Sequence, residues 1–537
     1  MFPQQLLLFH RKPIQNPKSK IGCLSSISMD YGLEIFLFLK NTELSLNPSS
    51  TLCASCLQHL MNLIWQKFTL SYFPLKEYLD SSYLHGSLVG VLRSWRQSSI
   101  LMQWGDIIAA TLVSLVLVLA PFTAANTTLL GVLLAACAGF WLLLTLSDEV
   151  SSSNNLFATP IHLLVLLYWG VCVVATALSP EKKAALEGLI NFTLYLVFFA
   201  LCARILKSPR IRAFLLVLYL HVSLVVSIYG VRQKFFGAAQ LATWVDPESP
   251  LSKNTRVYSY LGNPNLLAGY LLPAVILSFV AVFAWRGWLR KGLAITMLVV
   301  NLACFRFADS RGGFIGLAIA LVAIVLLLRY WYADYLPRFW RIWLVPILLG
   351  CFVAFFAIMF GVSETFRLRI TSIFAGRNDS SNNFRINVWT AVFRMIQDYP
   401  IFGIGPGHDV FNNIYPLYQL PRYNALSAYS VLLEVTVETG IVGLVSFVWL
   451  LVVIFNTGWL QLQRFRQLNS VDGLWLIGAI AALVGMLGHG FVDTVWYRPV
   501  VNSIWWLLVA LVASYWTPVV SDHNRQGNSL HPELGIN

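Results

Sequence analysis

Apolar runs and short polar segments alternate along the chain from about residue 107 to residue 516. Most runs approach the roughly 20 residues that a helix needs to cross the hydrocarbon core of a bilayer. Lipid offers the backbone no hydrogen-bond partners, so each run is expected to be helical. The pattern predicts about twelve spans, at residues 107–122, 129–146, 162–178, 188–203, 213–230, 266–285, 292–305, 314–331, 342–362, 438–455, 474–491 and 502–516.

A long polar interval, residues 363–430, interrupts this series. Apolar side chains recur in it at every fourth position, at Phe384, Val388, Val392 and Ile396. This spacing predicts an amphipathic helix, which Pro400 stops and which we expect to lie along the membrane surface. The predicted fold class is all-α, a polytopic integral membrane protein with one large loop that contains an amphipathic helix.

Composition excludes an ordinary soluble protein, because 57% of the residues are apolar and only 11% are charged. The formal net charge of +13 would suggest nucleic acid in a soluble domain, but here the basic residues lie in short loops. Lysine and arginine concentrate in cytoplasmic loops and so set the orientation of a membrane protein. The basic loops contain Arg204, Lys207, Arg210, Arg212, Arg286, Arg290, Lys291, Arg329, Arg338, Arg341, Arg464 and Arg466. Both termini are then cytoplasmic, the 363–430 loop is extracytoplasmic, and no nucleic-acid partner is expected.

The two ends of the chain differ from this membrane domain. Residues 1–60 have no sustained periodicity, and they do not resemble a signal peptide. One hypothesis is that translation starts at Met61 and that this extension is a gene-model artefact; the other is a genuine cytoplasmic extension. Residues 61–106 mix aromatic and basic side chains, as a cytoplasmic or interfacial segment does. The membrane domain then covers residues 107–516, and residues 517–537 form a polar cytoplasmic tail.

The eight cysteines add little chemistry to this picture. Cys53 and Cys56 form a single Cys-x-x-Cys without a second pair, which is weak evidence for metal or redox chemistry. Five others lie in or at the ends of apolar runs, where they are expected to be small core residues. No metal site and no cofactor is predicted.

Two arginines precede or begin predicted spans on the extracytoplasmic side. Arg256 lies before Asn263, which can cap a helix whose N-terminal amides would attract an anion. An ordinary capped helix start is the alternative interpretation. Arg311 is an arginine at a span end, where burial costs about 2.5 kcal/mol or more and requires a partner. It either points into an anion cavity or pairs with Asp309.

The large loop holds a third arginine and a glycine-rich turn. Arg385 falls near Trp389 at the edge of the apolar face of the predicted helix, where it could reach a lipid phosphate. The turn that contains Gly405 and Gly407 can expose successive amides as an anion nest, or it is a plain tight turn. His408, beside it, is a lone histidine of the kind that is more often structural than catalytic.

Two further pairs of ionisable residues follow helical spacing. Glu434 and Glu438 are one turn apart, either as paired carboxylates or as solvated residues. His489 and Asp493 are four residues apart, and Arg498 follows. This spacing permits a polar cluster of the His, Asp and Arg side chains. The alternative is a His–Asp pair that is hydrogen-bonded and has only a structural role.

These motifs together resemble the O-antigen ligase and polymerase superfamily, over most of the chain from about Ile107 onward. The matching segments are Ser310-Arg311-Gly312-Gly313, Arg385 to Trp389, Pro400 to Gly407, Glu438-Thr439-Gly440 and His489 to Pro499. Two runs resemble cyanobacterial inorganic carbon (bicarbonate) transporter B proteins more specifically: Tyr258-Ser259-Tyr260-Leu261-Gly262-Asn263-Pro264-Asn265 and Ser380-Ser381-Asn382-Asn383-Phe384-Arg385-Ile386-Asn387-Val388-Trp389. That similarity begins near Met61, which supports the artefact hypothesis.

Resemblance to the ligases implies about twelve helices in an inner (plasma) membrane, with the large loop periplasmic. It also implies a polyprenyl-diphosphate-linked glycan donor whose diphosphate is held by loop arginines, here Arg256, Arg311 and Arg385 by position. The ligases have a catalytic histidine followed by Asn, Ser or Gln, then nine residues, a glycine, and a second small residue three further on. The residues that fit the later positions are Ser430, Gly440 and Gly443.

The position of the ligase histidine is occupied by Tyr429. Tyrosine is a poor general base at neutral pH because its ordinary pKa is near 10, and His408 and Glu434 are weak candidates to replace the histidine. The first hypothesis is therefore bicarbonate uptake or accumulation through an extracytoplasmic anion site, although the sequence shows no obvious interrupted helices in paired halves. The alternatives are a glycosyltransferase that acts on a polyprenyl-diphosphate-linked glycan, and a noncatalytic carrier.

Overall fold

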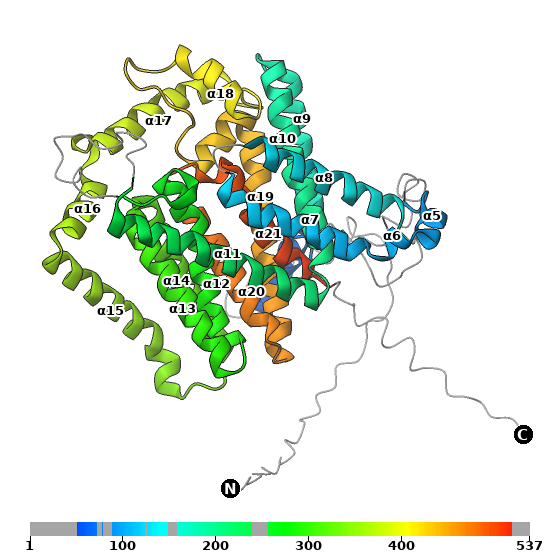
Figure 1. Ribbon diagram of the computed structural model, residues 1–537, viewed down its shortest axis with the longest axis horizontal. Helices are drawn as coiled ribbons and strands as arrows, with labels where there is room; N and C mark the ends of the chain where they lie inside the picture. The colour runs from blue at the N-terminus through cyan, green and yellow to red at the C-terminus, as the bar shows by residue number, and fades with distance from the viewer. Residues whose placement is uncertain are drawn as a thin grey trace, which may run out of the picture. The chain divides into compact units, whose positions relative to one another are not determined.

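The computed structural model describes residues 51–71, 73, 78, 89–123, 127–148, 158–238 and 256–517. All regular elements in these ranges are helices, which confirms the predicted all-α fold. The predictions for residues 1–50 and for the tail beyond residue 517 lie outside the described residues. So do the side chains of Cys53 and Cys56, although their backbone belongs to α2 (Thr51–Phe68). The chain divides into two compact units, Met1–Ile64 and Trp65–Asn537, and the second unit contains α5 to α21 (Figure 1).

Ten helices in the described part of the chain are long and apolar enough to cross a membrane. They are α7 (Gly105–Leu119, continued by η1, Ala120–Phe122), α8 (Thr127–Leu146), α9 (Pro160–Leu178), α10 (Lys182–Ile205), α11 (Pro209–Phe236), α12 (Pro264–Ala284), α13 (Trp288–Ala308), α14 (Arg311–Tyr332), α19 (Val431–Gln467) and α20 (Asp472–Gly490). Two further helices, α15 (Arg338–Val362) and α21 (Pro499–Ser514), occupy the remaining predicted runs. The protein is a polytopic membrane protein, with one helix for each apolar run.

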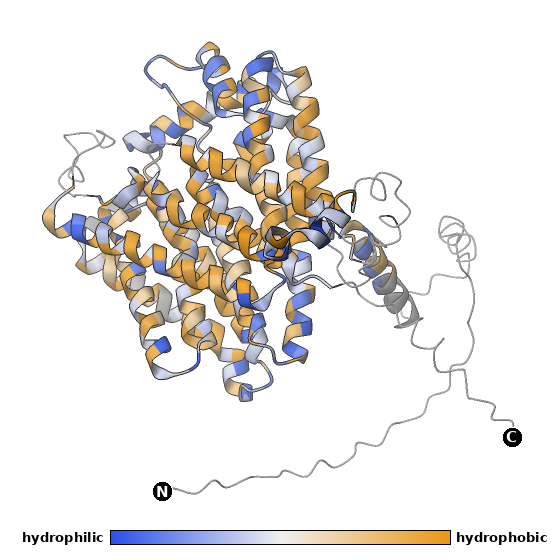
Figure 2. Ribbon diagram, turned by 45° about the vertical axis from the view of Figure 1, so that its right-hand side comes forward, coloured by the Kyte–Doolittle hydropathy of each residue, from blue (hydrophilic) through white to orange (hydrophobic). Residues whose placement is uncertain are grey.

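The remaining elements are short or belong to the large loop. They are α5 (Arg93–Ser98), α6 (Ile100–Gln103), η3 (Ser259–Leu261), α16 (Glu364–Phe374), η4 (Gly376–Asn378), α17 (Ser380–Asp398), α18 (His408–Ile414), η5 (Tyr415–Leu417) and η6 (Val495–Tyr497). Figure 2 shows apolar residues along the long helices and hydrophilic residues gathered near helix ends and loops.

The core of the second unit lies around α12 and α20, each of which is 83% buried within its most apolar stretch. A buried polar group joins three neighbouring spans there: Asn301 donates to Ser223 at 3.2 Å and to Ser278 at 3.3 Å, and it accepts from Ser227 at 2.8 Å. Such hydrogen bonds hold helices together where apolar packing alone gives no preference over lipid.

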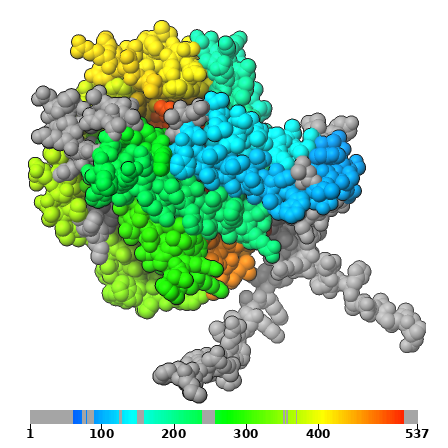
Figure 3. All heavy atoms as spheres, in the orientation of Figure 1, coloured from blue at the N-terminus to red at the C-terminus, as the bar shows by residue number. Residues whose placement is uncertain are grey.

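The amphipathic helix of the large loop is present as α17 and ends at Asp398, two residues before Pro400. Its apolar face is buried in protein and does not face lipid, as that of an amphipathic helix lying on a membrane surface would. Val388, Val392 and Met395 are 0% exposed, and they pack in a second apolar cluster with residues of α10, α18 and α19. The apolar face is therefore used to fold the loop onto the membrane domain, and this part of the chain covers one end of the second unit (Figure 3).

The helix α19 is interrupted at Gly440, which has φ 66° and ψ −167°. The segment before α18 passes alongside the break. Ile404 donates its amide to the carbonyl of Val437 at 2.9 Å, and Ile441 donates to the carbonyl of Pro400 at 2.9 Å. Backbone groups freed by the interruption thus find partners in the loop. The sequence gives no sign of this interrupted span.

Candidate functional site

The first part of the site is the start of α12. Asn263 caps this helix as the sequence predicts, accepting from the amides of Asn265 at 2.8 Å and Leu266 at 3.3 Å. The side chain of Asn265 then lies between two charged groups. Its Oδ1 accepts from Nη2 of Arg256 at 2.9 Å, and its Nδ2 donates to Oδ2 of Asp493 at 2.9 Å. The polar side chain of Asn265 therefore links Arg256 to Asp493, a role that the sequence does not reveal.

Asp493 connects this helix start to the large loop. Its Oδ2 lies 3.6 Å from Nη2 of Arg385 on α17, while its Oδ1 accepts from the amide of Thr494 at 2.8 Å. Arg385 donates from Nη1 to Ser381 at 3.0 Å, but its buried Nε has no hydrogen-bond partner among the described residues. We call Arg256, Asn265, Asp493 and Arg385 the arginine network, because these contacts join them in one chain.

Arg311 reaches the same helix of the loop by another route. Its Nη1 donates to Oδ1 of Asp379 at 2.9 Å and to Oδ1 of Asn382 at 3.2 Å. The expected alternative of an ion pair with Asp309 is wrong, since Asp309 pairs with Arg306 at 3.5 Å. Asn382 and Arg385 are one turn apart on α17, so Arg311 and the arginine network both contact the N-terminal half of this helix.

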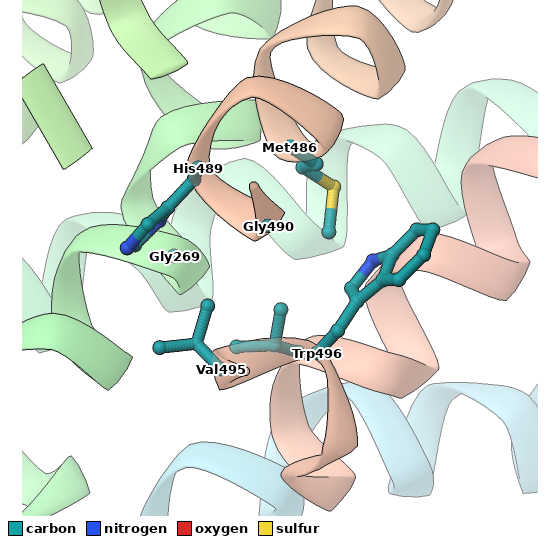
Figure 4. A pocket seen from close by; sticks show the side chains of 7 residues that line it. Gly269, Met486, His489, Gly490, Val495 and Trp496 are labelled. Atoms are coloured by element: carbon teal, nitrogen blue, oxygen red, sulfur yellow. The ribbon is translucent and has the colours of Figure 1, made fainter. Parts of the chain in front are cut away.

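His489 is buried beside the first turn of α14. It is 1% exposed, and neither of its ring nitrogens has a hydrogen-bond partner in the described part of the chain. A Cβ atom added at Gly312 would lie 2.7 Å from its Cδ2, so glycine is needed for this close approach. Figure 4 shows His489 and Trp496 on opposite sides of the small space between them. The spacing permits a His489–Asp493 pair, but the described residues show no hydrogen bond between them, and Asp493 accepts from Asn265 instead.

Tyr429 lies where the loop enters α19. Its φ of +50° is left-handed, and its ring packs edge-on against Phe384 with centroids 5.5 Å apart. Burial raises the pKa of the Tyr429 hydroxyl, and the neighbouring Asp493 raises it further. The hydroxyl thus stays protonated at neutral pH and can donate a hydrogen bond, but it cannot act as a general base there.

The residues next to Tyr429 fix the backbone rather than extend the site. Both backbone polar groups of Ala428 are hydrogen-bonded. Its carbonyl accepts from Nε1 of Trp389 at 3.0 Å, and its amide donates to Oε2 of Glu434 at 2.5 Å. Ser430 is the N-cap residue of α19, although its side chain makes no capping hydrogen bond. Trp389 therefore anchors this entry to α19.

The glycine-rich turn faces α19 and not the arginine network. Gly405 donates its amide to the carbonyl of Glu438 at 3.0 Å, and Gly407 donates to Oε1 of Glu438 at 3.0 Å. Tyr497 donates to Oε2 of the same carboxylate at 2.6 Å. The interpretation of Glu434 and Glu438 as solvated residues is wrong, because they are only 1% and 3% exposed.

A cavity of about 310 Å³ lies beside Glu438, and no sequence pattern pointed to it. It is bounded by α8, α9, α10, α19, α21, η6 and the start of α18. Its aromatic lining consists of Tyr168, Phe192, Tyr195, Phe447, Trp496, Tyr497, Trp505 and Trp506, and its polar side chains are Asn191, His408, Glu438 and Asn502. We call this space the aromatic cavity. The adjacent Trp505-Trp506 pair on α21 is a feature of the sequence that could have indicated this cavity, but on its own it says nothing about the other helices.

His408 lines the part of this cavity that the glycine-rich turn borders, and Arg498 acts on His408 electrostatically. Arg498 and His408 are both exposed, and His408 also lines the cavity. Partial burial lowers the pKa of His408, and the positive charge of Arg498 lowers it further. The positive charge of Arg498 thus lowers the pKa of both Tyr429 and His408.

Comparison with known proteins gives one match. Residues 296–448 match the family model for O-antigen ligase. This range begins in α13 and ends in α19, so it contains Arg311, Arg385 and Tyr429 but neither Arg256 nor Asp493. No curated protein matches the chain. The chain is thus a multi-pass membrane protein that is similar to O-antigen ligases over residues 296–448.

Proposed function

We propose that this protein binds a polyprenyl-diphosphate-linked glycan through its diphosphate, at Arg311 and the arginine network. One observation carries the proposal. Arg311 contacts the N-terminal half of α17, which also carries Arg385, and the buried Nε of Arg385 has no hydrogen-bond partner among the described residues. An unpartnered guanidinium nitrogen is costly when buried, and a phosphate oxygen would satisfy it.

The local charge also favours an anion. Arg256, Arg311 and Arg385 contribute three positive charges, and their partners Asp379 and Asp493 contribute two negative ones, which leaves one positive charge in excess. The Arg385–Asp493 pair is long at 3.6 Å, so a diphosphate could replace it at little cost. Guanidinium groups bind phosphate oxygens in pairs and stabilise the negative charge of a diphosphate leaving group without a metal.

The location of this charge agrees with a lipid-linked ligand. The arginines lie at the end of the membrane domain that carries α16 to α18, next to the ends of apolar spans. A donor anchored by a polyprenyl chain keeps its diphosphate at that level of the bilayer. By the distribution of basic loops we assign this end to the periplasm of an inner membrane. Similarity to O-antigen ligases over residues 296–448 supports the same ligand class.

Bicarbonate uptake is a second candidate, and the interruption of α19 at Gly440 favours it. Discontinuous helices form the ion and substrate sites of many secondary transporters. A single positive charge in excess would suit a small monovalent anion. The specific resemblance to bicarbonate transporter B proteins supports this candidate as well.

Direct binding measurements separate the two candidates. The purified full chain in nanodiscs is titrated with a polyprenyl diphosphate and with bicarbonate, and both titrations are repeated with Arg311→Ala and Arg385→Ala. Arg290→Ala, which removes an exposed charge at the start of α13, is the control. Each site variant should bind polyprenyl diphosphate roughly 10- to 100-fold more weakly, as expected for hydrogen bonds to a charged group. Unchanged polyprenyl diphosphate affinity in both variants would rule out this site, and bicarbonate binding alone, lost in both, would favour uptake.

A further inference from the structure

We propose that the aromatic cavity is a second binding site, which takes a substituted ammonium group held by the Glu438 carboxylate and the surrounding aromatic rings. This site is independent of the diphosphate site. Its volume of about 310 Å³ lies at the lower end of the roughly 300–1,000 Å³ that is usual for small-molecule sites.

The aromatic lining forms a connected belt of rings. Trp506, Phe192, Tyr168, Phe447, Trp496 and Trp505 follow one another, and successive ring centroids are 6.5, 5.5, 5.7, 5.8 and 3.7 Å apart. All five pairs are tilted or edge-to-face, with interplanar angles from 48° to 86°. Rings tilted against one another present both faces and edges, and an aromatic face attracts a cation. The belt thus provides the environment that a substituted ammonium group prefers.

Glu438 supplies the charge that selects a cation over a neutral molecule. It is the only carboxylate among the lining residues, and it is held in place by Gly407 and Tyr497. A carboxylate has about four acceptor positions, so two such bonds leave room for a ligand. In the described part of the chain no lysine or arginine lies within ion-pair distance of Glu438 or lines the cavity. A buried carboxylate without a cationic partner is costly, and a bound cation removes that cost.

The other ionisable groups near the cavity fit a cationic ligand. Glu434 is one turn from Glu438 and equally buried, and its Oε2 accepts from the amide of Ala428. Two buried carboxylates this close do not readily ionise together, so the pair contributes about one negative charge. His408 lines the cavity, but its lowered pKa keeps it neutral at pH 7. Arg498 acts on His408, but its side chain is exposed and is not among the lining residues. The carboxylate of Glu438 is therefore part of the cavity lining, whereas Arg498 is not.

Choline and its neutral isostere 3,3-dimethylbutan-1-ol test this proposal. Each is titrated calorimetrically into the full chain in nanodiscs that contain only phosphatidylglycerol, a lipid without an ammonium group. We expect choline to bind roughly tenfold more tightly than the isostere, as a desolvated cation–aromatic contact allows. Glu438→Gln should abolish that preference. Glu187→Gln, which removes an exposed carboxylate beside the lining residue Gly188, should retain it.

A second variant keeps the test valid if Glu438→Gln fails to fold. Trp506→Leu removes one ring of the belt and should reduce the preference for choline over the isostere by several-fold, with size-exclusion chromatography to check folding. Equal affinity for choline and the isostere would overturn the proposal. So would binding of neutral glucose that depends on Glu438, since that result identifies a sugar site.

The ammonium group could belong to a free metabolite or to a phospholipid headgroup. Repeating the choline titration in nanodiscs of phosphatidylcholine distinguishes these sources. Weaker apparent choline affinity in phosphatidylcholine, restored in phosphatidylglycerol, indicates that the headgroup enters the cavity. Equal affinity in both lipids assigns the site to free ammonium compounds.

Discussion

Arg311 and Asp379 form an ion pair of 2.9 Å that joins the start of α14 to the start of α17. The same Oδ1 of Asp379 also accepts from the amide of Asn382 at 2.9 Å, so this carboxylate caps α17 while it holds Arg311. Both side chains are about 15% exposed, which protects the pair from screening. The position of α17, and with it that of Arg385, depends on this one carboxylate.

The first prediction concerns this dual role of Asp379. Asp379→Ala removes the cap and leaves Arg311 without its charged partner, so we expect the free energy of unfolding to fall by about 2 kcal/mol. Asp379→Asn keeps a capping oxygen and should cost clearly less. Hydrogen exchange at the first turn of α17 measures the difference. Equal protection of these amides in both variants would show that the cap does not position the helix.

A second prediction concerns the interruption of α19. Gly440 has φ 66° and ψ −167°, a region open only to glycine, and a Cβ there would lie 2.1 Å from the carbonyl oxygen of Ile401. Gly440→Ala should therefore destabilise the fold by more than about 3 kcal/mol. Gly139→Ala is the matched control, because nothing lies within 4 Å of that position on α8 and the change should stabilise by about 0.5–1 kcal/mol. Thermal unfolding in detergent compares the two.

The bilayer explains why most of the fold could be predicted from the sequence. Each apolar run became a helix, and Asn263 and Pro264 begin α12 as their chemistry requires. Spans with polar ends are longer than predicted, as in α19, because hydropathy does not detect a helix that continues into water. The break at Gly440 could not be predicted, because Gly440 lies inside an apolar run that looks continuous. The break is stabilised by hydrogen bonds to the backbone of the loop before α18.

The candidate site was harder to predict, because its geometry depends on partners that are distant in sequence. Arg311 and Arg385 could be selected as costly charges near a membrane, but their partners Asp379 and Asp493 could not be assigned. The period-four pattern correctly predicted that α17 is a helix. It did not predict that the apolar face packs in a protein core, because an apolar face suits lipid and a protein core equally well. Side chains from several helices line the aromatic cavity. The periodicity of one helix carries no information about which other helices lie next to it.

The third prediction tests the orientation of the chain. Leu417 in the large loop is 80% exposed, and Leu468, at the other end of α19, is 67% exposed. In a background with all native cysteines replaced by alanine, a membrane-impermeant maleimide added to intact cells should label Leu417→Cys and not Leu468→Cys. Labelling should reach both after the cells are permeabilised. The reverse result in intact cells would place the arginine network in the cytoplasm.

A fourth prediction concerns the pKa of His408. Partial burial and the charge of Arg498 lower this pKa below its ordinary value of about 6.5, so folding favours the neutral ring. The resulting stability is present above the unfolded pKa and is lost as pH falls toward the folded pKa. Arg498→Gln should raise the pKa of His408, which NMR titration of histidine-labelled protein measures directly. An unchanged pKa would mean that Arg498 does not act on the ring.

The last prediction separates binding of a lipid-linked glycan from its transfer. By its resemblance to the ligases, the chain has Tyr429 where they have the histidine, and burial keeps the Tyr429 hydroxyl protonated at neutral pH. Histidine tolerates the left-handed backbone at this position better than most residues do, so Tyr429→His should fold with little change in stability. The new imidazole would have a pKa near neutrality and could accept a proton from an acceptor hydroxyl. If the arginines hold a diphosphate donor, Tyr429→His should gain glycosyl transfer in vitro, and Tyr429→His with Arg311→Ala should lose that gain. Transfer by the unchanged protein at the same rate would instead assign proton abstraction to another residue, with the buried and unpartnered His489 the first to test.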